Sequence, residues 1–157
     1  MLSKRAKSLK PSPTLALNAK AQELKAQGHD VISLSVGEPD WSTYQVITDT
    51  AIESLKRGDT KYYPSNGILP LRQAIVKQTQ RDFDIAYDPK CVTVSAGAKF
   101  ILFSALQVLV DPGDEVIIPA PYWVSYPTMV ELAGGVSVIA ECGASTRFKL
   151  TGEFLEK

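Results

Sequence analysis

The sequence predicts an α/β protein whose mainly parallel sheet is covered by helices. Strand-like and helix-like segments alternate through the second half of the chain, and short turns join them. The composition, 45% hydrophobic and 22% charged over 157 residues, is that of a globular protein rather than a disordered or fibrous one. We expect the sheet to be incomplete, because only about three core strands follow residue 90 whereas a typical sheet has roughly five or six.

Helix signals dominate the first half of the chain. Ser12 and Pro13 are residue types that favour a helix start, apolar residues then recur at near-helical spacing, and Gly28 is typical of a helix end. Residues 31–35, VISLS, form a short β-branched run that predicts a strand. The elements expected before residue 90 are a helix over 13–27, a strand over 31–35, a turn over 37–40, and helices over 45–57 and 70–83.

Strand and helix alternate regularly after residue 90. Residues 91–95, CVTVS, and 115–119, EVIIP, predict strands, and the helix between them completes a βαβ unit. That helix starts at Ala98 and is apolar on almost every side, so we expect other elements to cover it. The elements expected after it are a helix over 126–135, a strand over 136–141 and the opening of a further helix over 151–157.

Charge and hydropathy exclude several classes of partner. The chain has 17 basic and 17 acidic residues, so it has no net charge that would gather nucleic acid or an anionic membrane. No apolar run approaches the roughly 20 residues that cross a bilayer, and no apolar stretch follows the basic start as it would in a secretory signal. We therefore expect a cytoplasmic protein with neither nucleic-acid nor membrane partners.

Cysteine and histidine residues do not indicate redox or metal chemistry. Cys91 and Cys142 lie 51 positions apart, and His29 is the only histidine. These residues form neither a disulfide framework nor a zinc-binding pattern, so no metal site is expected. Both cysteines are predicted to be small buried residues in strands.

Residues 94–99, VSAGAK, place a tight turn between an expected strand and the helix that starts at Ala98. Backbone amides at a helix N-terminus are free to bind an anion such as a phosphate, and the helix dipole favours the same charge. The alternative is that Gly97 merely permits the turn. Neither a G-x-G-x-x-G pattern nor the ending of a P-loop is present, so the motifs give little support to a nucleotide-binding function of those types.

An aromatic cluster over residues 121–126, PYWVSY, directly follows the expected strand 115–119. Open α/β sheets bind ligands at the carboxyl ends of their strands, so a planar ring could stack on Trp123. The alternative is that Trp123 packs in the core, as aromatic residues commonly do. A phosphate held by one loop and a ring stacked on the next together describe a phosphorylated aromatic cofactor.

Five groups of short motifs occur in a fixed order along the chain. They are SVGEPD at 35–40, KY at 61–62 with Gly67 and LR at 71–72, SAGAK at 95–99, DPGDEV at 111–116 and PYW at 121–123. Together they closely resemble the N-terminal part of class I aminotransferases, pyridoxal phosphate-dependent enzymes of fold type I. KPSPT at 10–14 and PYWVSY at 121–126 are similar to the bacterial-type aspartate aminotransferase subgroup. The resemblance covers essentially the whole chain.

This resemblance implies a site for the cofactor pyridoxal 5'-phosphate. The backbone of Gly97, Ala98 and Lys99 is similar to the family's phosphate cradle, and Trp123 is similar to the residue that stacks on the pyridine ring. Tyr62 resembles the tyrosine that reaches the cofactor phosphate of the neighbouring subunit, which implies a homodimer with a shared active site. The alternative for Tyr62 is an ordinary half-buried loop aromatic.

A second implication concerns the substrates, which would be a small amino acid and a 2-oxo acid. Lys99 resembles the lysine that binds the distal carboxylate of acidic substrates, an interaction that selects aspartate or glutamate over apolar amino acids. Gly37 resembles a glycine whose backbone meets the substrate, and Thr14 a threonine that helps to place dicarboxylic substrates, including prephenate in dual-function members. The alternatives are a turn glycine, a solvated lysine and a helix N-terminal hydroxyl.

One departure from the family bears on catalysis. No lysine here is similar to the one that forms the Schiff base with the cofactor, so the resemblance implies no catalytic residue in this chain and an inactive isolated polypeptide. Residues 1–40 would form the N-terminal arm and the start of the small domain, and residues 41–157 the truncated start of the large cofactor-binding domain.

Two other functions remain open. A naturally truncated, non-catalytic chain would serve as a binding or interaction protein, and its incomplete sheet would expose apolar edges that favour aggregation or an obligate partner. A related pyridoxal phosphate-dependent lyase or synthase shares several of the same motifs. The feature at Lys99 and the context of Trp123 favour the aminotransferase, which would act on aspartate, or another acidic amino acid, and 2-oxoglutarate.

Overall fold

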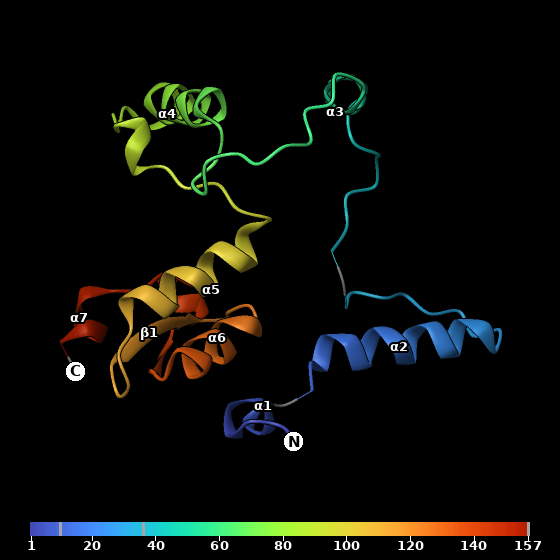
Figure 1. Ribbon diagram of the computed structural model, residues 1–157. Helices are drawn as coiled ribbons and strands as arrows, with labels where there is room; N and C mark the ends of the chain where they lie inside the picture. Colours follow the sequence, from blue (N-terminus) through green and yellow to red (C-terminus); the bar gives the residue numbers. More distant parts are fainter. Residues whose placement is uncertain (10, 36, 157) are drawn as a thin grey trace. The chain divides into compact units, whose positions relative to one another are not determined.

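The computed structural model describes residues 1–9, 11–35 and 37–156 of the chain (Figure 1). These residues fall into two compact units. We call Met1–Leu9 together with Val94–Lys157 the sheet unit, and Lys10–Thr93 the helical unit.

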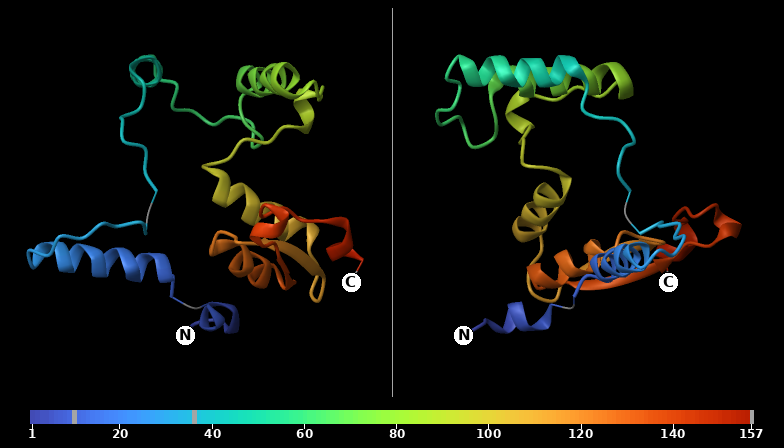
Figure 2. Two further views of the ribbon diagram at one scale, coloured as in Figure 1. Left: turned by 180° about the vertical axis from the view of Figure 1, so that it is seen from behind. Right: turned by 90° about the vertical axis from the view of Figure 1, so that its right-hand side faces the viewer.

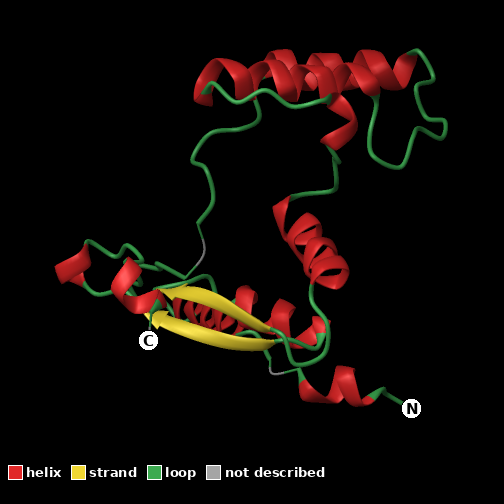
Figure 3. Cartoon of the chain, turned by 90° about the vertical axis from the view of Figure 1, so that its left-hand side faces the viewer, coloured by secondary structure: helices red, strands yellow, loops and turns green. Residues whose placement is uncertain are grey.

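A parallel pair of strands organises the sheet unit. Strand β1 (Glu115–Ala120) pairs with β2 (Val136–Glu141) in a register that runs from Glu115 opposite Val136 to Ala120 opposite Glu141. Figure 3 shows the two arrows side by side and pointing the same way. Parallel strands need a crossover connection, which α6 (Ser125–Ala133) provides. The α/β class and the parallel sheet expected from the sequence are therefore confirmed.

The core of the sheet unit lies where α6 meets the two strands. Helix α6 packs on both strands, as Figure 2 shows, and α5 (Ala98–Leu109) packs on α6. The close packing of Val110, which follows α5, and Val130 of α6 depends on Gly135. A Cβ at Gly135 would lie 2.7 Å from Val110 Cγ1 and 3.0 Å from Val130 Cγ1. The buried hydrophobic residues of this core are Ile118, Met129, Val130, Ala140 and Cys142.

Short helices complete the sheet unit. Ser3 accepts a hydrogen bond from the amide of Ala6 and so caps α1 (Lys4–Ser8), a helix that the sequence analysis did not predict. The 3-10 helix η2 (Ala144–Thr146) was also not predicted. Helix α7 (Gly152–Leu155) confirms the expected helix start near the end of the chain.

Among its described residues, the helical unit contains three helices and one 3-10 turn, and the three helices agree with the expected ranges. Ser12 caps α2 and Gly28 follows it with φ of +86°, as its start and stop signals predict. Among the described residues, every helix of either unit is too short or too polar to cross a lipid bilayer. The elements are α2 (Pro13–Ala26), α3 (Gln45–Lys56), α4 (Leu69–Phe83) and η1 (Pro89–Cys91).

The strands predicted at 31–35 and 91–95 are not formed. Residues 31–35 have no regular structure, and 91–95 begins with the last residue of η1 and continues as an irregular segment. A strand is stable only when a neighbour pairs with its backbone, and no described segment pairs with either run. The residue pattern of these two runs is compatible with a strand, but it does not show whether another strand is available to pair with them.

Two burial predictions were also wrong. Cys142 is buried as expected, but Cys91 lies exposed in η1. Helix α5 was expected to be covered, yet none of its residues is buried and Val108 and Leu109 are largely exposed. The physical reason is that α6 covers one side of α5 and no described element of the sheet unit packs closely on the rest of its surface.

Candidate functional site

The N-terminus of α5 is an open set of hydrogen-bond donors. Gly97 precedes the helix with φ of +86°, a left-handed conformation that glycine adopts without strain, and its amide donates to the carbonyl of Ser95 at 2.9 Å. No side chain caps this helix. Among the described residues, the backbone amides of Ala98, Lys99 and Phe100 have no acceptor. Three free donors at the positive end of a helix dipole form a favourable anion site.

Lys99 joins this helix start to the segment that follows β1. Its ammonium Nζ lies 4.5 Å from the centroid of the Trp123 ring, within the range of a cation–π interaction. Tyr126 meets the same indole edge-on, with ring centroids 5.6 Å apart and an interplanar angle of 89°. Residues 24 positions apart in the sequence thus form one site at the carboxyl end of a strand.

The charge around this site favours an anionic ligand. The first turn of α5 contains no acidic residue, so the free amides and the Lys99 ammonium are not neutralised locally. Trp123 remains 41% exposed, which leaves part of its ring surface available for stacking. The arrangement can therefore bind a negatively charged group beside a planar ring.

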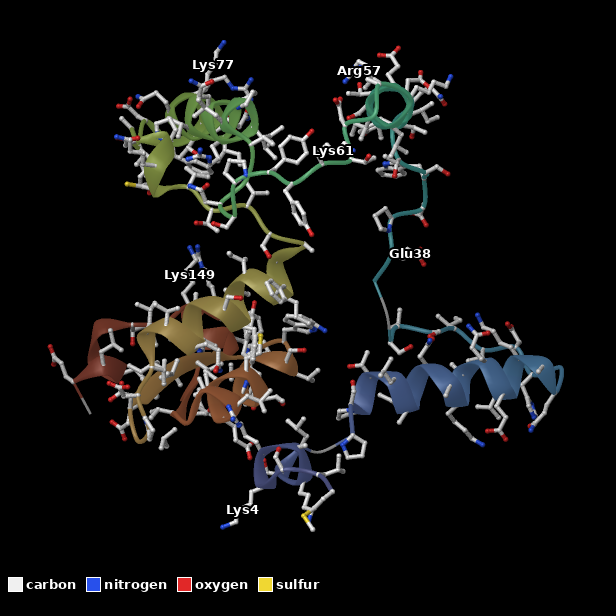
Figure 4. The ribbon with its side chains drawn as sticks, in the orientation of Figure 1. Lys4, Glu38, Arg57, Lys61, Lys77 and Lys149 are labelled. Carbon is white, nitrogen blue, oxygen red and sulfur yellow. The ribbon has the colours of Figure 1, made fainter. Side chains whose placement is uncertain are left out.

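The other residues singled out in the sequence belong to the helical unit. Thr14 lies half-buried in the first turn of α2. Gly37 lies on the connection between α2 and α3, where a Cβ would meet no atom of the chain within 4 Å. Tyr62 is fully exposed on the loop between α3 and α4, and Figure 4 labels Lys61 on the same loop. The structure thus brings together Gly97, Ala98, Lys99 and Trp123, and places Thr14, Gly37 and Tyr62 on separate segments of the other unit.

Two residues with specific contacts were not assigned a role from the sequence. Tyr126 supports the indole of Trp123, and its spacing of three residues on PYWVSY was the only available signal. Arg72 was noted only as part of the LR motif, and it is the one buried charged side chain among the described residues. In the same part of the chain, no cluster of three or more histidine, cysteine, aspartate or glutamate residues could hold a metal ion.

The fold and the site define a class of protein, and comparison with known proteins agrees with it. The sequence profile of the family described as "Aminotransferase class I and II" matches residues 29–157. This chain belongs to that family. The structural match to this family extends over 99% of the chain, so it includes the helices of the helical unit as well as the parallel strand pair.

Individual relatives narrow the similarity to aspartate aminotransferases. The chain is 51% identical to the aspartate aminotransferase of Bacillus sp. (strain YM-2) and 53% identical to that of Geobacillus stearothermophilus, each over 99% of this chain and 40% of the relative. A solved structure, the aspartate aminotransferase from Thermus thermophilus with maleate, matches with a TM-score of 0.91 and 43% identity, over 99% of this chain and 41% of that one. The chain therefore spans about 40% of the length of these relatives, in their N-terminal portion.

Proposed function

We propose that this chain is the part of a pyridoxal phosphate-dependent aminotransferase that holds the cofactor phosphate and ring and selects acidic substrates. In the complete protein an amino group would pass between aspartate, or another acidic amino acid, and 2-oxoglutarate. The observation that carries the proposal is the N-terminus of α5, where three free amides adjoin the Lys99–Trp123 pair. Membership of the aminotransferase family supplies the reaction class.

The residues present fit pyridoxal phosphate. Its phosphate would accept hydrogen bonds from the amides of Ala98 and Lys99. Gly97 leaves space for the phosphate, because it has no side chain and no atom of the chain lies within 4 Å of the place where its Cβ would be. Trp123 would stack on the pyridine ring. When bound, the cofactor supplies an electron sink for the transfer of the amino group.

Three residues would select the substrate. The Lys99 ammonium would form a charge-assisted hydrogen bond with the distal carboxylate of an acidic amino acid, and Gly37 and Thr14 would help to place the rest of the molecule. The name of the Thermus thermophilus structure supports this substrate class, because maleate is a dicarboxylate.

The remaining parts of the proposal concern assembly. Tyr62, fully exposed in its loop, would reach the cofactor phosphate of a second subunit in a homodimer. Residues 1–40 would belong to the arm and small domain and residues 41–157 to the large domain. We place the protein in the cytoplasm.

Catalysis would require a lysine that no residue of this chain supplies. Lys99 lies at the start of α5, in the proposed phosphate turn, where it would bind an anion rather than form the covalent bond with the cofactor. The 157-residue chain should therefore form no oxaloacetate from aspartate and 2-oxoglutarate. If it does, this part of the proposal is wrong.

Cofactor titration of the complete gene product tests the central claim. We expect Trp123→Ala to weaken pyridoxal phosphate binding about 3- to 10-fold, because aromatic stacking contributes roughly 0.5–1.5 kcal/mol. Trp41→Ala, which changes an exposed tryptophan of the helical unit, is the matched control and should bind the cofactor as the wild type does. Equal affinities for wild type and Trp123→Ala would exclude the stacking role.

Substrate selection is tested by Lys99→Ala in the same protein. The KM for aspartate should rise about 10-fold or more, the effect of losing one charge-assisted hydrogen bond, whereas the KM for alanine should change little. Equal increases for both amino acids would show that Lys99 does not recognise the distal carboxylate. A complete gene product that binds the cofactor but releases the amino group without transferring it would favour the alternative of a lyase.

A further inference from the structure

Arg72 is buried in a helix that otherwise lies open to solvent. Its side chain comes from the first turns of α4 and is 9% exposed, whereas all the other charged residues of the described chain are half-buried or exposed. Burying a guanidinium group is costly unless its donors are satisfied. A feature with such a cost needs a specific explanation.

Two backbone carbonyls accept hydrogen bonds from this guanidinium group. Arg72 Nε donates to the carbonyl of Gly67 at 3.0 Å, and Nη1 donates to the carbonyl of Pro89 at 2.9 Å. Among the ion pairs of the described residues, none involves Arg72. The side chain therefore ties together two loops that lie on either side of α4 in the sequence, rather than neutralising a carboxylate.

The first of these loops carries Tyr62 through a short, stiff connection. The amide of Gly67 donates to the carbonyl of Pro64 at 2.9 Å, which closes a turn at the base of the loop. Pro64 restricts the backbone of the preceding Tyr63 to extended conformations, and Tyr62 stands directly before it. Four residues separate Tyr62 from Gly67, and Pro64 together with the Pro64–Gly67 hydrogen bond restricts the backbone between them.

We infer that Arg72 is a positioning residue that fixes the 61–67 loop so that Tyr62 presents its hydroxyl to a cofactor phosphate. The inference rests on the proposed function, because it assumes that Tyr62 contacts that phosphate. Because its side chain is buried against the carbonyls of Gly67 and Pro89, Arg72 would act through Tyr62 and not by touching the cofactor or the substrate. Its planar fork is suited to this task because it spans two carbonyls at once, which the single ammonium of a lysine does not do.

The test uses the complete gene product, stripped of cofactor, and measures the dissociation constants of pyridoxal 5'-phosphate and of pyridoxal. We expect Arg72→Gln and Tyr62→Phe each to weaken binding of the phosphorylated form about 10-fold, the usual consequence of losing a hydrogen bond to a charged group. Binding of pyridoxal, which has no phosphate, should stay within about twofold of wild type. The double variant should be no weaker than the worse single variant, because both changes remove one interaction.

Two further variants control for stability and charge. Arg81→Gln removes an exposed arginine of the same helix, which pairs only with Asp82, and should bind both compounds as wild type does. Arg72→Lys keeps the charge but loses the fork, so we expect a smaller, phosphate-specific loss. Arg72→Lys also keeps the test decisive if Arg72→Gln does not fold.

The outcomes separate this inference from the proposed function. If Tyr62→Phe weakens cofactor binding while folded Arg72 variants bind like wild type, the inference is overturned and the proposed function stands. Equal weakening for pyridoxal and its phosphate would show a general structural role and would also overturn the inference. Failure of the wild-type protein to bind pyridoxal phosphate would reject the proposed function, and the inference with it.

Discussion

The two units of the chain hold their structure by different means. In the sheet unit, β1, β2 and α6 bury five hydrophobic residues at one junction. In the helical unit, the only buried side chain among the described residues is the charged Arg72, and apolar residues such as Leu17 and Leu55 face solvent. Local signals thus locate the helices of the helical unit, whereas the core of the sheet unit forms where a helix packs on paired strands.

Local hydrogen bonds explain why the helical unit still has regular structure. Ser12 caps α2, Lys20 pairs with Glu23 one turn further on, and Gln45 donates to Asp49 across one turn of α3 at 2.7 Å. Each of these interactions contributes only tenths of a kcal/mol to about one kcal/mol. We therefore expect substitutions in the two units to differ most where they remove apolar volume.

Met129→Ala should have the largest effect on stability. Met129 is 5% exposed in α6, and truncating such a residue costs roughly 2–5 kcal/mol because a cavity replaces packed atoms. Leu17→Ala in α2 is the counterpart in the helical unit and should change the free energy of unfolding by no more than about 0.5 kcal/mol. Urea denaturation followed by circular dichroism measures both. Similar losses would abolish the contrast between the units.

Gly135→Ala tests how tightly the sheet unit is packed. Its new methyl group would lie 2.7 Å from Val110 Cγ1 and 3.1 Å from the carbonyl oxygen of Asp114, so we expect a loss of about 1–3 kcal/mol. Gly143→Ala is the control, because its Cβ would meet only Ser145 Oγ, at 3.9 Å. In the same denaturation experiment, Gly143→Ala should have a clearly higher free energy of unfolding than Gly135→Ala, and equal values would contradict tight packing at Gly135.

Ser12→Ala tests the helical unit, where a cap rather than a core is removed. The Ser12 hydroxyl accepts from the amide of Leu15 at 3.5 Å, a long bond, so the loss should be about 0.5–1 kcal/mol. Helix content by circular dichroism and denaturation would report it. Ser12→Asp keeps an acceptor and adds a charge that favours the helix start, so it should be near wild type. A loss for Ser12→Asp equal to that of Ser12→Ala would exclude the capping role.

The smallest effect on stability is expected for the exposed hydrogen bonds of Asp59. The Ser54 hydroxyl donates to its carboxylate at 2.9 Å and the Arg57 guanidinium donates through two nitrogens, and these bonds lower the pKa of Asp59. The folded pKa is below the unfolded one, so the stabilisation is complete above the unfolded pKa and is lost as the pH falls through the folded value. In an NMR titration, Ser54→Ala should raise the pKa of Asp59. An unchanged pKa would show that Ser54 does not contribute.

The helices could be located from the sequence because the residues that start and end a helix lie next to it in the chain. Ser12 with Pro13, and Gly28 after the last turn, mark α2 within one residue of its observed bounds. The strands predicted at 31–35 and 91–95 were wrong, because a strand depends on a partner strand that the residue pattern cannot identify. Strands β1 and β2 were predicted correctly, and they have each other as partners.

The candidate site was predictable to a similar extent. The turn at Gly97 was located from small residues between a β-like run and a helix, and the structure gives that glycine a positive φ. The contact between Lys99 and Trp123 was not predictable, because it depends on how α5 packs on α6 and on the path of the segment between β1 and α6. The burial of Arg72 also could not be read from the sequence, because arginine is rarely buried and nothing nearby in the chain marks its two carbonyl acceptors.

The contacts of Lys99 and Tyr126 with Trp123 also give the molecule an internal fluorescence reporter. The chain has two tryptophans, Trp41 in the helical unit and Trp123 in the sheet unit. Trp41 faces water, whereas the indole of Trp123 has an ammonium group over its face and a phenol at its side. Replacing Trp41 with phenylalanine would leave tryptophan fluorescence from the sheet unit alone, so the unfolding of that unit can be followed without attaching a dye.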